Sequence, residues 1–272
     1  MKFVDRYERL VRERNTVLCV GIDPALPKQR NTYTIPQKYV YGNDENKARL
    51  DFCLDIVDMV KDNAIAIKPN QQYVFGFTKK EHRRLTDLIR KRNMLSILDY
   101  KLNDISDTVA SAIFHLSEAG YDAVTFNPLA GNLEETIKLA HDSVTAMRGY
   151  DLGIFVLTLM SNPEAVTFMK EPMVGRVPMF AFIAQQVKDF EADGCVVGAT
   201  GHVTGMDIKK IRSIVGPDKI FLVPGVGTQK GDIRKVLMAA GENIIVNVGR
   251  DIIYSEDPRE RSREYSIKLA IH

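Results

Sequence analysis

The sequence predicts a closed (β/α)8 barrel of the TIM-barrel class, built by residues 1–272 as a single domain with an extra N-terminal helix. Three observations support this fold class. The chain has 272 residues, which is close to the usual size of such a barrel. Eight short apolar runs rich in β-branched residues recur along it, as expected of strands buried on both faces of a parallel sheet. Amphipathic stretches of helical period separate most of these runs, and this alternation is typical of parallel α/β folds.

The predicted elements follow one another from the N-terminus. A charged amphipathic helix from about Phe3 to Glu13 comes first and is expected to cap the bottom of the barrel. Strands are predicted at Val17 to Ile22, Ala64 to Ile67, Leu95 to Leu98, Ala123 to Phe126, Ile154 to Thr158, Cys195 to Val197, Ile220 to Val223 and Ile244 to Val248. Helical stretches between them include Glu45 to Val60, Glu81 to Arg92, Asp107 to Ala119 and Leu133 to Met147. The longest connection runs from Pro24 to about Gly42, and loops of that length are often functional.

Composition and charge argue against several classes of protein. Lys and Arg number 37 against 35 Asp and Glu, a formal charge of +2, so we expect no nucleic-acid partner. The cysteines Cys19, Cys53 and Cys195 are odd in number and widely spaced, which argues against a disulfide framework or a zinc site. The N-terminal stretch lacks the apolar segment of a signal peptide, and no apolar run approaches the roughly 18 residues of a membrane span. We therefore expect a cytoplasmic protein with no membrane partner.

Polar side chains collect where the predicted strands end. The residues that follow or end an apolar run are Asp23, Lys68, Asp99, Lys101, Ser161, Gln229 and Arg250. In closed α/β barrels the active residues come from this C-terminal rim. So many polar residues in one kind of position predict an enzyme.

Asp99 and Lys101 form the most informative pattern. They stand two residues apart at a predicted strand end, and the two-residue period of a strand places both side chains on one face. Lys68 ends the preceding strand, and Asp104 follows in the next turn. A lysine between carboxylates stays protonated and can donate a proton to a carbanion, which suits a decarboxylation. A structural ion pair, with Asp104 or Ser106 capping the next helix, explains the same residues about as well.

Two glycine-containing loops predict a phosphate site. Gly225 and Gly227 follow the seventh predicted strand, and Gly249 and Arg250 follow the eighth. Loops after these two strands form the usual phosphate site of such barrels. Glycines let backbone N–H groups approach phosphate oxygens, and an arginine can pair with the dianion through two parallel bonds. The alternative is that the glycines only make a tight turn and that Arg250 is a surface charge.

Taken in order, the motifs resemble those of orotidine 5′-monophosphate decarboxylases over nearly the whole chain. The matching segments are Leu18-Cys19-Val20-Gly21-Ile22-Asp23-Pro24, Lys68-Pro69-Asn70, Asp99-Tyr100-Lys101-Leu102-Asn103-Asp104-Ile105, Asn127-Pro128, Ser161-Asn162-Pro163, Val197-Gly198-Ala199-Thr200, Pro224-Gly225-Val226-Gly227 and Gly249-Arg250. The long segment after Pro24 and the Lys-Pro-Asn triplet are similar to the longer bacterial branch of the family. The resemblance implies a cofactor-free enzyme that converts orotidine 5′-monophosphate into UMP and carbon dioxide, the last step of de novo pyrimidine nucleotide synthesis.

The resemblance also implies catalytic roles. Lys101 would protonate the pyrimidine C6 after carbon dioxide leaves, and Asp99 would lie against the departing carboxylate. Lys68 would bridge Asp99 and a ribose hydroxyl. Asp104 would cross a dimer interface into the partner's site, with Thr108 touching the ribose there. This arrangement implies a homodimer with active sites shared across the interface.

The remaining implied roles concern substrate binding. Asp23 would bind the ribose, and Ser161 would form a hydrogen bond with the pyrimidine. Gln229, Gly249 and Arg250 would hold the phosphate. None of these groups requires a metal ion.

Two alternatives to this function stay open. One is a related sugar-phosphate barrel, such as a 3-keto-gulonate phosphate decarboxylase or a hexulose phosphate synthase, which shares the Asp-x-Lys-x-x-Asp pattern but uses magnesium. The other is a barrel that binds nucleotide phosphates without catalysis, because fold and phosphate loops alone would permit that. Activity in the presence of a chelator separates the first from orotidylate decarboxylation, and any turnover excludes the second.

Overall fold

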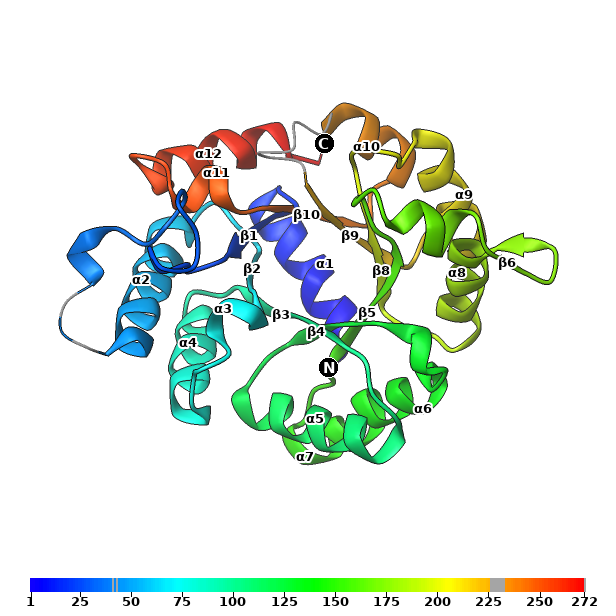
Figure 1. Cartoon of the computed structure of the whole chain (residues 1–272), viewed down its shortest axis with the longest axis horizontal. Coiled ribbons are helices and arrows are strands. Elements are labelled where there is room, and N and C mark those ends of the chain that lie inside the picture. The colour runs from blue at the N-terminus through cyan, green and yellow to red at the C-terminus, as the bar shows by residue number, and fades with distance from the viewer. Residues whose placement is uncertain (41, 43, 226–232, 272) are drawn as a thin grey trace.

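Eight parallel strands close into a barrel, which Figure 1 shows end on. The computed structural model describes residues 1–40, 42, 44–225 and 233–271, with only the backbone of residues 233–235. The barrel strands are β1 (Leu18–Ile22), β2 (Ala66–Pro69), β3 (Leu95–Leu102), β4 (Ala123–Phe126), β5 (Gly153–Leu159), β8 (Gly194–Val197), β9 (Ile220–Pro224) and β10 (Ile244–Val248). Their order around the barrel is β1-β10-β9-β8-β5-β4-β3-β2. The predicted fold class is confirmed, and all eight predicted strands are present with small differences at their ends.

Helices surround the barrel. They are α2 (Glu45–Val60), α3 (Gln71–Val74), α4 (Lys79–Lys91), α5 (Ser106–Ala119), α6 (Leu133–Lys138), α7 (Val144–Arg148), α8 (Met179–Asp189), α9 (Gly205–Val215), α10 (Ile233–Ala240), α11 (Arg250–Ile253) and α12 (Pro258–Lys268). The bounds of α2 match the prediction, because the side chain of Asp44 accepts a hydrogen bond from its first turn. A capping box between Thr78 and Glu81 starts α4 at Lys79, two residues before the predicted start.

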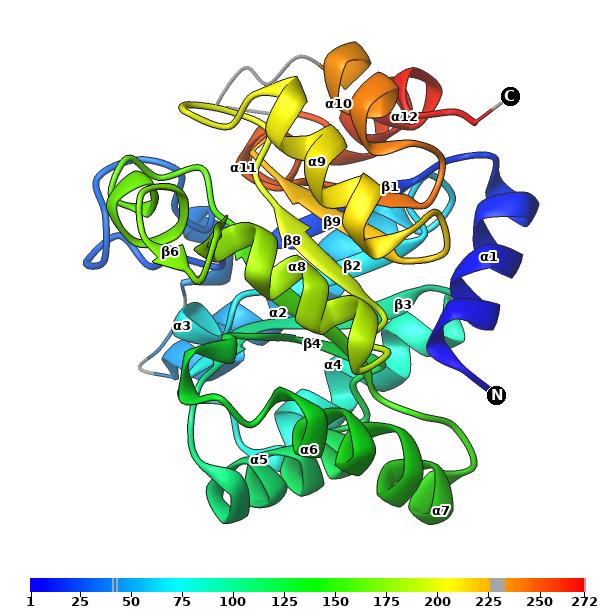
Figure 2. The same cartoon turned by 90° about the vertical axis from the view of Figure 1, so that its right-hand side faces the viewer.

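Helix α1 (Phe3–Arg14) fills the end of the barrel where the strands begin. Figure 1 shows it across the centre of the ring of strands, and Figure 2 shows it at one end of the barrel. Its side chains Phe3, Tyr7 and Leu10 are buried. The ring of Phe3 meets the ring of Phe155 edge to face at 5.5 Å, and the Tyr7 hydroxyl donates to the Ile244 carbonyl at 2.9 Å. The predicted cap of the barrel bottom is therefore present, and it continues the apolar packing of the barrel interior.

Two segments differ from the prediction. The helix expected from Leu133 to Met147 is divided into α6, a π-helical turn η3 (Leu139–Ser143) and α7. After β5, the π-helical turn η4 (Val166–Lys170) and a small hairpin of β6 (Met173–Val174) and β7 (Val177–Pro178) lengthen the connection to α8. Short 3-10 turns η1 (Gln37–Tyr39) and η2 (Pro128–Ala130) complete the elements. Among the helices that the structure describes, none has the length and apolarity needed to cross a membrane.

Candidate active site

Two adjoining cavities, each of about 180 Å³, lie at the C-terminal ends of the strands. One is lined by Gly21, Asp23, Lys68, Asn70, Asp99, Pro224, Gly225, Asn247, Gly249 and Arg250. The other is lined by Lys68, Asp99, Lys101, Thr125, Leu157, Met160, Ser161, Asn162, Val196, Leu222 and Pro224. Because three residues line both, we describe the two cavities together as the rim cleft. A larger cavity of about 750 Å³ lies between α2 and α4, outside the barrel, but barrel enzymes place their chemistry at the strand ends.

Asp99 binds two lysines in the rim cleft. Its Oδ2 accepts a hydrogen bond from Lys68 Nζ at 2.5 Å, and its Oδ1 accepts one from Lys101 Nζ at 2.6 Å. Lys68 is 6% exposed, whereas the side chain of Lys101 is 48% exposed. The array is therefore one carboxylate between a buried ammonium group and an accessible one.

Burial and charge act in opposite directions on the two buried members of this array. Burial alone would raise the pKa of Asp99, but the ammonium groups of Lys68 and Lys101 outweigh burial and hold this pKa well below its usual range. Burial alone would lower the pKa of Lys68, but the carboxylate of Asp99 outweighs it and raises this pKa. Both residues are therefore charged at neutral pH.

A β-bulge brings Lys101 back to Asp99. The register between β3 and β4 shifts between Leu98 and Leu102, and Lys101 has a φ of 55°, a conformation uncommon outside glycine. Thr125 on β4 holds the bulge, because its Oγ1 accepts a hydrogen bond from Lys101 N at 2.9 Å and donates one to Asp99 Oδ1 at 3.2 Å. The prediction that the two side chains share one face is confirmed by their ion pair, although the backbone departs from regular strand geometry at Lys101.

The cavity end near β10 contains most of the predicted phosphate residues. Gly249 and Arg250 follow β10 directly and line the cleft with Gly225. Space there is tight, because a Cβ atom added to Gly249 would lie 3.2 Å from the carbonyl oxygen of Gly21. Gln229 and Gly227, which the sequence also assigned to phosphate, lie outside the described residues.

Asp23 lines the same cavity and is held by its backbone. Its carbonyl oxygen accepts a hydrogen bond from the Tyr254 hydroxyl at 2.6 Å and another from the Arg30 guanidinium at 3.2 Å. Arg30 belongs to the long connection after Pro24, so this connection contributes directly to the shape of the cleft.

Ser161 follows β5 and lines the other cavity. It packs closely against Gly198, where an added Cβ atom would lie 2.7 Å from the Ser161 Cβ. A glycine is therefore required after β8 to let Ser161 occupy this place.

Asp104 and Thr108 are not brought to the array within one chain. Both are exposed, and Asp104 Oδ1 accepts a hydrogen bond from the backbone N–H of Ile105 at 2.8 Å. Neither residue is among those that line the rim cleft. Within the described chain, Lys101 has one carboxylate partner, Asp99, where the sequence had suggested two.

Sequence reasoning missed several residues that line the rim cleft. Thr125 lies inside an apolar strand, and its position within the apolar run Ala123 to Phe126 gave no sign of its contact with the bulge. Asn70 ends up beside Asp99 through an isolated bridge between the two backbones. Asn247 lies on β10, and its Oδ1 would meet a Cβ added at Gly21 at 2.8 Å. The sequence of β10 could have identified Asn247, because it is the one polar residue of that strand.

Comparisons with known proteins agree with this geometry. The model of the Orotidine 5′-phosphate decarboxylase / HUMPS family matches residues 16–265. Orotidine 5′-phosphate decarboxylase of Roseiflexus sp. (strain RS-1) is 30% identical, with 94% of this chain and 90% of the relative covered. That of Caldicellulosiruptor bescii is 29% identical, with the same shares covered.

Solved structures share the fold. Orotidine 5′-monophosphate decarboxylase of Plasmodium berghei has a TM-score of 0.79 at 21% identity, with 98% of this chain and 97% of that chain covered. Orotidine 5′-monophosphate decarboxylase of Methanocaldococcus jannaschii, complexed with inhibitor BMP, has a TM-score of 0.70 at 23% identity, with 94% and 99% covered. The architecture of the barrel is thus the same in all three proteins.

Proposed function

The chain belongs to the Orotidine 5′-phosphate decarboxylase / HUMPS family, and from this membership and its rim cleft we infer that it decarboxylates orotidine 5′-monophosphate to UMP and carbon dioxide. The reaction belongs to pyrimidine nucleotide synthesis. The single observation that carries the mechanism is the Lys68–Asp99–Lys101 array, because it sets a fixed anion and an accessible proton donor side by side.

We propose that the array acts on the bond between C6 of the pyrimidine and its carboxylate. When this bond breaks, its electron pair stays on C6 and carbon dioxide leaves. Lys101 then gives a proton from Nζ to C6, and the new C–H bond completes UMP. The ammonium group also stabilises the developing negative charge at C6, which is the larger contribution expected from a preorganised site. Asp99 holds Lys101 in place and lies where the substrate carboxylate departs.

The binding roles follow the two ends of the rim cleft. Arg250, Gly249 and Gln229 are proposed to hold the phosphate, and Asp23 and Lys68 the ribose. Ser161 is proposed to form a hydrogen bond with the pyrimidine. Five of these six residues line the cleft, which supports the assignment. Gln229 is proposed from the sequence alone. All of these groups are side chains or backbone of the protein, and the reaction is proposed to need no cofactor.

We also propose a homodimer in which Asp104 and Thr108 complete the partner's site. Three large apolar side chains are exposed at the same rim: Phe75 (77%), Ile105 (69%) and Leu129 (63%). They follow the neighbouring strands β2, β3 and β4. Exposed apolar groups that gather in this way mark interaction surfaces, and Asp104 lies beside Ile105 on this surface.

A cytoplasmic location is proposed for the enzyme. All three cysteines are free and buried, which is typical of proteins from reducing compartments.

The test is a spectrophotometric assay with orotidine 5′-monophosphate, with and without EDTA, on the wild type and on Lys101→Ala. We expect turnover that survives EDTA in the wild type. Lys101→Ala should lose it by a factor of about 100 or more, the usual contribution of a proton donor, while UMP binding is largely kept. Lys138→Ala is the matched control, since Lys138 is 68% exposed on α6 and pairs with Glu134. Near-normal turnover in Lys101→Ala would defeat the proton-donor role, and loss of wild-type turnover in EDTA would favour a magnesium-dependent relative.

A further inference from the structure

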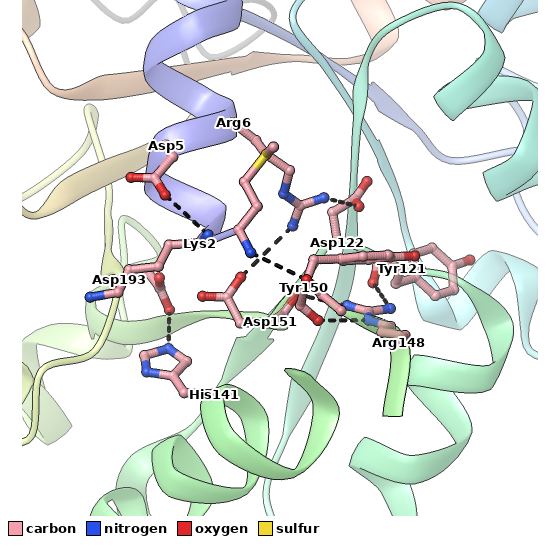
Figure 3. Close-up of polar contacts among 12 residues, drawn as sticks. Lys2, Asp5, Arg6, Tyr121, Asp122, His141, Arg148, Tyr150, Asp151 and Asp193 are labelled. Carbon is pink, nitrogen blue, oxygen red and sulfur yellow. Dashed lines mark hydrogen bonds and ion pairs between the residues drawn. The ribbon is translucent and has the colours of Figure 1, made fainter. Parts of the chain in front are cut away.

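A second group of charged side chains lies at the opposite end of the barrel, beneath the start of α1. Three aspartates there lie one or two residues before the starts of β4, β5 and β8: Asp122, Asp151 and Asp193. All three are buried, with exposed fractions of 3%, 4% and 5%. Figure 3 shows them together with Arg6 of α1 and His141 of η3. Buried carboxylates need partners to compensate the loss of water, so each one must be accounted for.

Two of the three carboxylates have well-defined partners. Asp122 forms an ion pair with Arg6, and its other oxygen accepts hydrogen bonds from the backbone N–H and the hydroxyl of Ser96 at 2.8 and 2.9 Å. Asp193 Oδ2 accepts a hydrogen bond from the Ile154 N–H at 2.8 Å and lies 2.9 Å from His141 Nε2. Asp122 and Arg6 therefore compensate each other, and Asp193 is fixed in orientation.

Asp151 is the exception. Its Oδ1 is buried and forms no hydrogen bond within the described part of the chain. Arg6 Nη2 lies 4.0 Å from this oxygen, beyond hydrogen-bonding distance, and the same guanidinium binds Asp122 through Nη1. An unpartnered oxygen of a buried carboxylate costs the free energy of its lost hydration. In Figure 3 this carboxylate is turned toward Asp193 and Arg6, into the cluster.

His141 adds an imidazole nitrogen to the carboxylates of Asp151 and Asp193. It lies in the π-helical turn η3, a kind of distortion often found at functional sites. Ligand atoms of His141, Asp151 and Asp193 all lie within 4.8 Å of one another. The separation of 2.9 Å between the imidazole nitrogen and the Asp193 oxygen suits two ligands about 90° apart on one ion, given metal–ligand bonds of about 2.0–2.2 Å.

We propose that His141, Asp151 and Asp193 bind a divalent transition-metal ion, with water completing the coordination. One imidazole and two carboxylates form a mixed nitrogen and oxygen set, which suits Zn²⁺ or Mn²⁺ better than Mg²⁺. Two carboxylates and a neutral imidazole carry a charge that a divalent ion cancels. The Ile154 N–H on Asp193 supplies the outer hydrogen bond that commonly orients a metal ligand.

The proposed site is structural, not catalytic. It would connect three parts of the chain that are far apart in sequence: the η3 turn, the start of β5 and the start of β8. The rim cleft lies at the other end of the strands, and the decarboxylation proposed there does not involve this ion.

The test uses the full-length enzyme after treatment with a chelator and its removal. Zn²⁺, Mn²⁺ and Mg²⁺ are titrated separately by calorimetry, and the Tm is measured with and without each ion. We expect one Zn²⁺ or Mn²⁺ bound per chain and a Tm raised by a few degrees, because the ion binds only the folded state. Mg²⁺ should bind weakly. Values of kcat/KM measured well below the Tm should be the same with and without the ion.

Two variants locate the ion, and a third serves as control. His141→Gln and Asp151→Asn each remove one ligand while keeping the size of the side chain, and each should weaken Zn²⁺ binding about tenfold or more. His115→Gln should bind like the wild type, because that histidine is 69% exposed on α5. The proposal fails if no ion binds at one per chain, or if both ligand variants bind Zn²⁺ as the wild type does. If the Tm of Asp151→Asn equals that of the wild type at every metal concentration, Asp151 is a protonated acid that binds no ion. The proposal then fails too.

Discussion

At the residue scale, the chemistry of the rim cleft depends on Asp99, which serves two ammonium groups at once. One of them, Lys68, has hardly any contact with water and has Asp99 as its hydrogen-bonding partner. The other, Lys101, keeps access to the cleft while Thr125 fixes its backbone. Asp99 thus organises the site sterically and electrostatically, and its removal should affect folding as well as turnover.

We expect Asp99→Asn to lower the free energy of unfolding by about 3 kcal/mol, because it leaves the buried charge of Lys68 without a counter-ion. Chemical denaturation at neutral pH measures this change. Asp87→Asn is the matched control, since the Asp87 side chain is 61% exposed and pairs with Arg90 at 3.7 Å. Equal stability of the two variants would mean that Lys68 does not depend on Asp99.

His82 adds a pH dependence away from the active site. It lies between Phe77 and Tyr121, and its Nδ1 is 2.9 Å from the Tyr121 hydroxyl. Burial lowers the pKa of His82 to about 4, below the unfolded value of about 6.5. The unfolded chain therefore binds a proton more readily, so stability is fully present above pH 6.5 and is lost as the pH falls toward 4.

We expect this histidine to account for a loss on the order of 2 kcal/mol in unfolding free energy between pH 7 and pH 4.5. Denaturation curves at the two pH values should show a smaller loss in His82→Gln than in the wild type. His115→Gln, at an exposed histidine, should show the wild-type loss. A wild-type loss in His82→Gln would show that other groups dominate acid destabilisation.

At the element scale, α1 stands outside the alternating strands and helices and packs against the interior of the barrel. Its first turn inserts Phe3 among the barrel residues beside Phe155 and Gly153, where a Cβ added to Gly153 would lie 2.7 Å from the Phe3 ring. The glycine at the start of β5 therefore makes room for the aromatic ring. Helix α1 therefore contributes side chains to the core of the barrel, as the strands do.

We expect Phe3→Ala to lower the unfolding free energy by about 3–5 kcal/mol, the usual cost of emptying a buried phenylalanine site. The rim cleft is at the other end of the strands, so kcat/KM should stay close to wild type at temperatures well below the Tm. Ile267→Ala, at a side chain 62% exposed on α12, should change neither quantity. A large loss of kcat/KM in folded Phe3→Ala would contradict this separation of the two ends.

Elements were predicted best where one local pattern dominates. Strands such as β4 and β10 are apolar apart from one residue each, so both their type and their bounds could be predicted from sequence. The π turn η3 could not, because its residues continue a helical period and only the backbone hydrogen bonds differ. Asp151 and Asp193, like Asp122, stand just before their strands, yet their meeting with His141 depends on the closure of the barrel. The bulge at Lys101 was also hidden, since it depends on pairing with Thr125.

At the scale of the whole molecule, the proposed dimer explains why the array has one acid per chain. Lys101 has Asp99 beside it, and the second acid of the motif, Asp104, points to a different place in the single chain. The exposed Ile105 and Leu129 lie at the rim where a second copy would bring its own Asp104 toward this lysine.

A mixing experiment tests this arrangement. Lys101→Ala and Asp104→Asn should each be inactive alone, but a mixture allowed to exchange subunits should recover about one quarter of wild-type activity. Half of the dimers are then mixed, and each mixed dimer has one site with both Lys101 and a partner's Asp104 intact. Mixing two copies of the same variant is the control. No recovery in mixtures shown to exchange subunits would place Asp104 outside the shared site.

Helix α1 covers the end of the barrel where the strands begin, and the rim cleft opens at the other end. In the proposed reaction, orotidine 5′-monophosphate enters through the rim cleft, and carbon dioxide and UMP leave through it. Substrate binding and product release therefore follow one another at the same opening. In the proposed binding mode, carbon dioxide can leave from the pyrimidine side while the phosphate stays bound, whereas UMP must leave the whole rim cleft before the next turnover. Accumulated UMP therefore competes directly with incoming substrate, and dissolved carbon dioxide does not.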